Sequence, residues 1–293
     1  MSFRSMIRGW RQRGDEADAD ADADFDAYLV SFPKSGRTWL TVALGRALQQ
    51  HFGLAGTNPL ELREMGRLRT DVPHIRILHE DRPHRKRPEE LATSKEQFRG
   101  SKVMFLARDP RDVVVSYYFQ RAKREPARRI LFFQRKRRET HAPFTGTLSE
   151  FLSVPVGGFD TLLRYYNIWA ENRTVPAQFL LVRYEDMHAE PARELRKVLA
   201  FLGLKAVRDE VIADAVQYSS FDNMRKLEQR DALGSFKLRP ADVNDADSYK
   251  VRRGKIGGYV DYLAPEEIEM LNGKMAAELS SFYGYSPCAG PSG

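Results

Sequence analysis

The fold of this 293-residue chain is decided by residues 29–40, which read Leu29-Val30-Ser31-Phe32-Pro33-Lys34-Ser35-Gly36-Arg37-Thr38-Trp39-Leu40. An apolar, β-prone run ends there in a turn that contains proline and glycine, and the apolar spacing then predicts a helix over residues 38–50. A strand, a tight loop and a helix N-terminus can cradle a phosphate, because backbone N–H groups and the positive end of the helix dipole point at the anion. Lys34 adds a full charge, and Ser35 and Thr38 add hydroxyl donors. The lysine precedes the glycine, so this phosphate loop is not a Walker A motif.

Two further segments have the character of anion sites. Residues 103–107 are a continuous apolar run, as expected of a strand buried on both faces of a parallel sheet. Arg108 stands at its carboxyl end, Pro110 begins the next predicted helix, and Ser116 meets Arg108 only if the loop folds back toward that helix. Residues 252–259 form a basic, glycine-containing loop. Three such elements suggest a ligand with more than one phosphate-like group.

These elements resemble the PAPS-dependent sulfotransferases, most closely those of the cytosolic type. The family elements and their counterparts here are Y-P-K-S-G-T-T-W at residues 32–39, R-x-x-x-D-x-x-x-S-Y-Y at 108–118, Y-E-D-M at 184–187, T-S-F-x-x-M at 219–224 and R-K-G-x-x-G-D-W at 252–259. They come in the family's order, and the resemblance spans residues 28–286. It implies that the chain is an enzyme that transfers a sulfuryl group from PAPS (3′-phosphoadenosine 5′-phosphosulfate) to an alcohol or phenol.

The resemblance also implies which residues bind the PAPS cofactor. The expected set is Lys34, Ser35, Gly36, Arg37, Thr38, Trp39, Arg108, Ser116, Tyr184, Ser219, Phe221, Arg252, Arg253 and Gly254. Within it, Arg108, Ser116 and residues 252–254 are expected at the 3′-phosphate, and Trp39, Tyr184 and Phe221 at the adenine. Without the family, Trp39 and Phe221 would be interpreted as core aromatics and Ser35 as a helix cap.

Catalysis is assigned to Lys34 and His79. A cation near the leaving phosphate is what an in-line transfer needs, and Lys34 lies in the phosphate loop. His79 follows a strand predicted over residues 75–78, and an imidazole can accept the proton of an alcohol near neutral pH. The competing histidines are His74, at the start of that strand, and His84, in a charged loop. No metal is expected.

The chain departs from the family pattern at several positions. Arg37 replaces a threonine of the 5′ loop, and Ile77 stands where the family has a lysine two residues before its catalytic histidine, so Arg37 is expected to supply that charge. Arg253 replaces a lysine, so a planar guanidinium with several N–H donors stands in place of a compact ammonium charge. Residues 260–269 retain only Glu269 of the family's dimerisation motif, so that dimer is not supported.

Alternating strands and helices predict an α/β fold of the P-loop-like, three-layer kind, with a mostly parallel central sheet flanked by helices. Ligands bind such sheets beyond the carboxyl ends of the strands. One domain is expected over residues 27–286, between an acidic and basic disordered tail (1–26) and a flexible C-terminal tail (287–293). The remaining predicted elements are helices at 88–98, 110–124, 159–171, 191–202, 211–217 and 265–283, a strand at 179–184, and a mobile loop over the cofactor at 228–251.

Composition limits the function classes. The net charge is +7, and residues 121–138 hold nine Lys or Arg against one acid. This segment is interpreted either as a solvated face or as a surface that guides an anionic cofactor or acidic acceptor; without a recognition motif, nucleic acid is not an expected partner. No apolar run reaches the length of a transmembrane segment, the N-terminus lacks a secretory pattern, and Cys288 is the lone cysteine, so a cytoplasmic protein is predicted.

Two other functions stay open at this point. A nucleotide-dependent phosphotransferase is disfavoured by the missing Walker A pattern, and a non-catalytic nucleotide or polyanion binder by the presence of both Lys34 and His79. The acceptor is expected to be a hydroxyl of a small molecule or glycan, and an acidic acceptor is one of the options.

Overall fold

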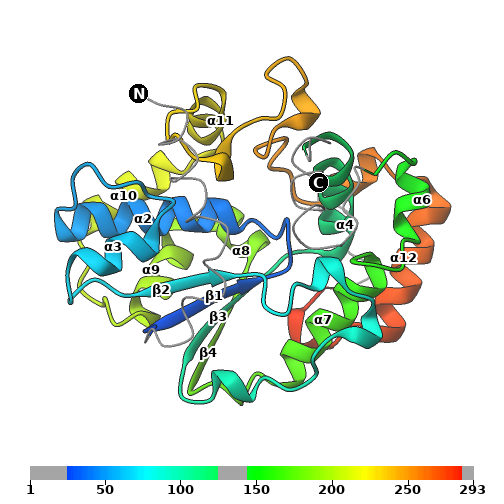
Figure 1. Ribbon diagram of the computed structural model, residues 1–293, viewed down its shortest axis with the longest axis horizontal. Helices are drawn as coiled ribbons and strands as arrows, with labels where there is room; N and C mark the ends of the chain where they lie inside the picture. The colour runs from blue at the N-terminus through cyan, green and yellow to red at the C-terminus, as the bar shows by residue number, and fades with distance from the viewer. Residues whose placement is uncertain (1–24, 125–143, 286–293) are drawn as a thin grey trace, which may run out of the picture.

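A four-stranded parallel sheet forms the centre of the molecule in the computed structural model, which describes residues 25–124 and 144–285 (Figure 1). The strands are β1 (Ala27–Ser31), β2 (Ile75–Leu78), β3 (Lys102–Ala107) and β4 (Gln178–Arg183), in the spatial order β2-β1-β3-β4. All three pairings are parallel. The predicted mostly parallel sheet is therefore confirmed.

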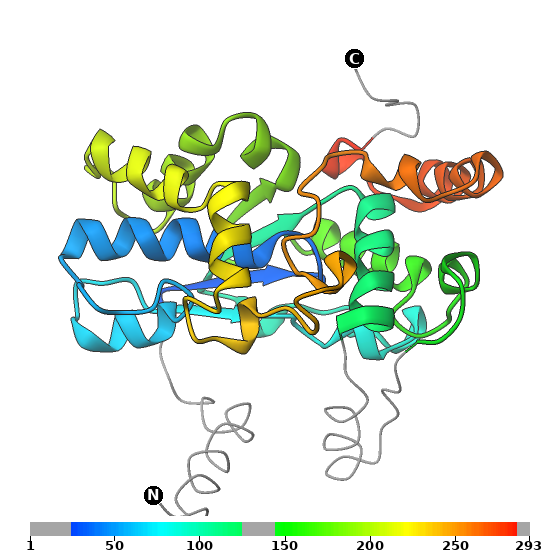
Figure 2. The ribbon, with the colours of Figure 1, turned by 90° about the horizontal axis from the view of Figure 1, so that it is seen from above.

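Each strand alternates its side chains between two apolar layers, which gives the three-layer architecture. Val30 and Phe105 point into one layer, whereas Leu29 and Met104 point into the other. The first layer is closed by α4 (Pro110–Phe119), α6 (Leu148–Leu152), α7 (Phe159–Glu171) and α12 (Pro265–Glu278). The second is closed by α2 (Arg37–Phe52), α3 (Leu62–Leu68), α9 (Pro191–Phe201) and α10 (Asp209–Tyr218). Figures 1 and 2 show these two groups of helices on opposite sides of the sheet.

The strand order explains where a ligand binds. The chain leaves β1 toward β2 on one side of the sheet, whereas β3 and β4 lie on the other side of β1. The connections after β1 and β3 therefore diverge, and a crevice opens between the carboxyl ends of these two central strands. Residues 32–36 and Arg108 follow these two ends directly.

Two helices complete this edge of the sheet. Helix α8 (Tyr184–Ala189) follows β4, and α11 (Phe221–Gln229) packs on α2 through a small cluster that includes Val42 and Met224. After α11 the chain continues through three short 3-10 turns, Phe236–Leu238, Ala246–Ser248 and Gly258–Asp261.

Most predicted helices are present with ends shifted by a few residues, but the helix predicted over residues 88–98 is wrong. Two 3-10 turns, Pro88–Glu90 and Glu96–Phe98, stand there instead. The Lys95 ammonium turns inward to the carbonyl of Ala92 and to the Glu80 carboxylate, which keeps the chain in an irregular path. The C-terminal helix ends at Glu278, before residue 283, and the helix predicted over 110–124 changes to a π-helix after Phe119.

Several predictions fall on residues outside those described. They concern the two tails, 1–24 and 286–293, and most of the basic segment 121–138. In the described part of the chain, no helix is both long enough and apolar enough to pass through a bilayer.

Candidate active site

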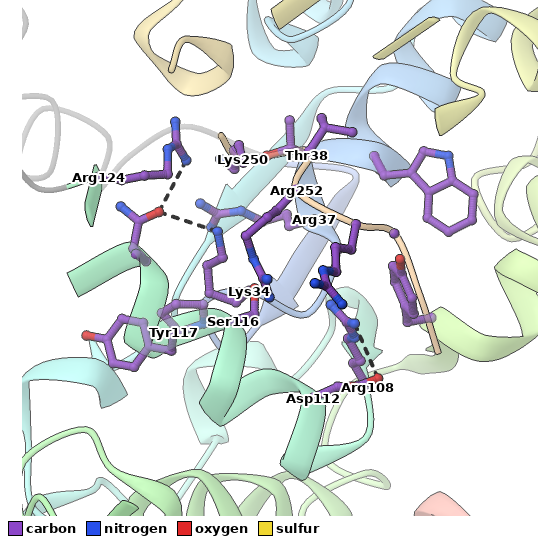
Figure 3. A pocket seen from close by; sticks show the side chains of 18 of the residues that line it. Lys34, Arg37, Thr38, Arg108, Asp112, Ser116, Tyr117, Arg124, Lys250 and Arg252 are labelled. Carbon is purple, nitrogen blue, oxygen red and sulfur yellow. Dashed lines mark hydrogen bonds and ion pairs between the residues drawn. The ribbon is translucent and has the colours of Figure 1, made fainter. Parts of the chain in front are cut away.

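A cavity of about 780 Å³ lies at the crevice between β1 and β3. It is lined by His79 and by every residue of the predicted cofactor-binding set except Ser35. The loop after β1, the start of α4, Tyr184 of α8, Phe221 of α11 and the 252–255 loop meet there, although they are far apart in sequence. Figure 3 shows Lys34, Ser116 and Arg252, from three of these segments, around the cavity.

The phosphate loop after β1 is held in an unusual backbone conformation. Lys34 and Gly36 have φ values of 74° and 100°, in the left-handed region. A Cβ on Gly36 would lie 2.6 Å from the Tyr184 ring, so glycine is needed for both reasons. The hydroxyl of Ser35 donates to the carbonyl of Phe32 at 3.0 Å. This hydroxyl therefore does not cap α2, whose N-cap residue is Gly36, and a role of Ser35 in binding an anion stays a prediction.

Positive charge dominates the cavity. Its lining includes one carboxylate, Asp112, and eleven Lys or Arg residues. The cations are Lys34, Arg37, Arg85, Arg108, Arg124, Lys237, Arg239, Lys250, Arg252, Arg253 and Lys255. Such an excess of one sign concentrates a field that attracts a polyanion.

Arg108 and Asp112 organise one end of the cavity. Asp112 lies 3.3 Å from the Arg108 guanidinium and accepts the backbone N–H groups of Gly257 and Tyr259 at 2.9 and 3.0 Å. Arg108 also donates to the carbonyl of Lys255 at 3.1 Å. This buried carboxylate therefore ties the start of α4 to the basic loop. Arg111, next to Asp112 in the chain, is also buried and pairs with Asp109.

The basic loop presents its cations unequally. Arg252 packs over the rings of Phe119 and Tyr262, at 4.0 and 4.8 Å from their centroids, and lies at the cavity. Arg253 is half exposed and pairs with Asp261 at 2.8 Å. Gly254 has a φ of 63°, and a Cβ there would lie 2.5 Å from the Phe221 ring.

Trp39, Tyr184 and Phe221, which the resemblance implies for an adenine site, line the cavity together with Tyr117 and Tyr262. The Trp39 and Tyr184 rings meet edge to face, with centroids 5.4 Å apart. Phe221 remains 42% exposed, so it is not a core aromatic. The Ser219 hydroxyl donates to the carbonyl of Ala215 at 2.8 Å, and Ser219 still lies on the cavity wall.

Lys34 lies where its charge is poorly balanced. Its Nζ donates to Oε1 of Gln120 at 3.4 Å, and Gln120 also accepts from Arg124 at 3.2 Å. Burial, together with the charge of Arg124, lowers the pKa of Lys34 to about 7. Gln120 was not predicted from the sequence. It begins the π-helix Gln120–Arg124, an irregularity often found at functional sites.

His79 stands at the carboxyl end of β2 with its ring fixed by β1. Nδ1 lies 2.7 Å from the carbonyl of Ser31, which can only accept, so Nδ1 carries the proton and Nε2 is left with a free lone pair. Burial, with the charges of Arg37 and His84, lowers the pKa of His79 well below 6.5. The ring is therefore neutral at pH 7 and able to accept a proton.

The two other candidate histidines are placed differently. His84 also lines the cavity, with its ring centroid 5.7 Å from that of His79, which its position in a charged loop did not predict. His74 lies before the first residue of β2 and stacks on Phe25. It is at the opposite end of the strand from the cavity.

A family model described as "Sulfotransferase domain" matches residues 24–282. The chain belongs to the sulfotransferase family. Relatives of this sulfotransferase include cytosolic sulfotransferase 17 of Arabidopsis thaliana, which is 26% identical over 85% of this chain and 73% of its own length. Sulfotransferase 1A1 of Mus musculus is 27% identical over 80% of this chain and 77% of its own length. A solved mouse sulfotransferase complexed with PAP shares the fold, with a TM-score of 0.58, 23% identity, and coverage of 88% of this chain and 85% of that one.

The protein is a PAPS-dependent sulfotransferase, and its cavity fits that donor. Nε of Arg108 is buried without a hydrogen-bond partner in the described structure. The hydroxyls of Thr38 and Ser116 line the cavity, and neither has a hydrogen bond to another described residue. A bound polyanion would supply the acceptors that these donors need.

Proposed function

We propose that this sulfotransferase moves the sulfuryl group of PAPS to a hydroxyl of a small-molecule or glycan acceptor, with His79 as the general base and Lys34 as the cation at the leaving phosphate. Nε2 of His79 takes the acceptor proton while the acceptor oxygen bonds to sulfur. The bond from sulfur to the phosphate oxygen breaks in line, and Lys34 with the N–H groups of the phosphate loop stabilises the charge that gathers on that oxygen. The observation that carries the proposal is the Nδ1 contact of His79 with Ser31, which leaves Nε2 as a proton acceptor in the cavity that Lys34 lines.

Further residue roles belong to the same proposal. Arg108, Ser116, Arg252, Arg253 and Gly254 hold the 3′-phosphate. Thr38, Arg37 and the N–H groups of residues 35–36 hold the phosphosulfate. Trp39, Tyr184 and Phe221 surround the adenine, and Ser219 supports its edge. We also propose a cytoplasmic location, a domain over residues 27–286, and no dimer through residues 260–269.

The direct test combines transfer and binding. We expect label from PAPS to appear on hydroxyl acceptors, and PAP to raise the melting temperature more than AMP does, because only PAP carries the 3′-phosphate. Transfer of the γ-phosphate of ATP under the same conditions would favour a phosphotransferase. PAP binding without any release of PAP from PAPS would favour a non-catalytic binder.

Arg108→Ala separates the two ends of the donor. We expect PAP affinity to fall by roughly 10- to 100-fold, because a charge-assisted bond to a buried phosphate is lost. Adenosine 5′-phosphosulfate, which lacks the 3′-phosphate, should bind the variant nearly as it binds the wild type. Titration calorimetry with both ligands measures the difference, and Arg99→Ala, which removes an exposed arginine paired with Glu96, is the matched control. Equal losses for both ligands would remove Arg108 from the 3′-phosphate site.

PAP affinity is expected to weaken between roughly pH 7 and pH 9. The Lys34 pKa of about 7 means that this ammonium has lost its proton in most ligand-free molecules at pH 8. A bound phosphate raises that pKa, so binding takes up a proton above pH 7 and becomes weaker as protons become scarce. Calorimetry in buffers of different ionisation enthalpy measures the uptake, which should be smaller in Lys34→Met. An affinity that is flat over this range, without proton uptake, would contradict the prediction.

A further inference from the structure

Lys250 is a cavity cation that the proposed donor site does not use. It lies just before the basic loop, and its Nζ donates to the carbonyl of Lys237 at 3.0 Å. Most charges around it are positive: burial and the charges of Arg124, Lys34 and Arg37 lower its pKa well below the ordinary value, against a smaller opposing effect of Glu228. Figure 3 shows Lys34, Arg37 and Lys250 around one space, with Arg124 on its border.

Glu228 contacts the backbone of Lys250 but does not pair with its ammonium. Glu228 is fully buried, and its two oxygens accept the backbone N–H groups of Lys250 and Val251 at 2.6 and 2.8 Å. It lies 3.9 Å from the Arg124 guanidinium. Among the described residues, no carboxylate lies within ion-pair distance of the Lys250 ammonium. Glu228 thus fixes the backbone of Lys250 and offsets only part of its charge, because it forms no ion pair with the ammonium.

Two other cavity lysines have carboxylate partners. Lys237 pairs with Glu61 at 2.7 Å, and Lys255 pairs with Asp261 at 3.0 Å. In the described parts of the chain, Lys34 and Arg37 share with Lys250 the lack of such a pair. Three neighbouring cations recessed from water without acids are costly unless anions fill the space between them.

Charge counting assigns two of the three cations to the donor. The transferred end of PAPS carries one negative phosphate and one negative sulfuryl group. Lys34 and Arg37, both in the phosphate loop, match these two groups. Lys250 comes from a separate segment and is left over, and it lines the same cavity as His79, the proposed base. The anionic group that matches Lys250 is therefore expected on the acceptor, close to its hydroxyl.

We infer that the acceptor of this sulfotransferase carries an anionic group, a carboxylate or comparable oxyanion, that Lys250 binds while His79 receives the hydroxyl proton. The inference rests on the proposed function and narrows its acceptor to hydroxylated acids. Lysine suits this task as a compact point charge that does not demand a bidentate partner.

The test uses acceptors that differ in one charge. They are 4-hydroxyphenylacetate against its amide, and methyl glucuronide against methyl glucoside, with kcat/KM measured for each. We expect the acid to be preferred by roughly 10- to 100-fold in at least one pair, the range of a charge-assisted hydrogen bond. Lys250→Met should bring the ratio near one, chiefly through KM of the acid, and Lys250→Arg should restore part of it. Lys237→Met, which removes a cavity lysine already paired with Glu61, should keep the wild-type ratio.

The outcomes separate the two proposals. If PAPS yields neither sulfated product nor PAP, the proposed function itself fails. If PAP is released but the wild type prefers neither acid, the inference fails. This result does not depend on whether Lys250→Met folds. A Lys250→Met variant that loses turnover equally with acid and neutral acceptors would place Lys250 on the sulfuryl group and overturn the assignment to the acceptor.

Discussion

Turnover of an aliphatic alcohol is expected to fall by roughly 10²- to 10⁴-fold in His79→Ala, the range for loss of a general base. PAP should bind this variant with near-normal affinity, because His79 lies beside β1 rather than among the proposed phosphate ligands. Turnover of a phenol with a low pKa should fall less in this variant, because such a phenol releases its proton with less help from a base. Steady-state rates with acceptors of graded pKa, together with a PAP titration, measure both parts.

The histidine controls come from the same neighbourhood. His74→Ala removes an imidazole at the other end of β2 and should retain activity. His84→Ala removes the imidazole beside His79, and we expect a smaller loss that does not depend on acceptor pKa. A fully active His79→Ala, or one that no longer binds PAP, would remove His79 from the mechanism and make His84 the next candidate.

Lys34→Ala should reduce turnover by roughly 10²- to 10³-fold, the cost of losing one preorganised group that stabilises charge in the transition state. PAP binding should weaken less than turnover, because the leaving phosphate carries more charge in the transition state than in the bound donor. Single-turnover rates with saturating PAPS separate the two effects. Lys197→Ala, a surface lysine paired with Glu194, is the matched control.

An unchanged single-turnover rate in Lys34→Ala would show that another cation stabilises the leaving phosphate. Arg37 is the first alternative, because it lies in the same loop, and burial lowers its pKa only to about 10, so its charge persists at neutral pH. The double variant of Lys34 and Arg37 would then show the loss that the single variant does not.

Much of the fold was predictable because its signals are local. The apolar runs at β1 and β3 predict strands that are buried on both faces. The residues that follow these runs lie at the edge of the sheet where ligands bind. The family motifs then predicted cofactor-binding residues, which the structure places around one cavity. Their roles in binding and catalysis stay predictions.

The features that could not be predicted from the sequence depend on contacts between residues that are distant in the chain. Gln120 matters through a contact with Lys34, 86 positions away, and nothing in its own segment marks it. In the sequence, Lys250 has the character of an ordinary surface lysine. Its lack of an ion pair follows from the structure, in which the carboxylate of Glu228 accepts backbone N–H groups instead. A helix was predicted over residues 88–98, but the pairing of Lys95 with Glu80 decides the path of the chain there.

The glycines of both anion loops are pressed against aromatic rings, Gly36 against Tyr184 and Gly254 against Phe221. Neither glycine can gain even a methyl group while its ring stays in place, and each ring also faces the cavity. Sequence drift at these four positions is therefore constrained in pairs: a change at either glycine requires both a residue that tolerates its positive φ and a smaller or displaced ring. A lineage that made such a change would lose a wall of the cavity first, so descendants that keep the activity should keep both pairs intact.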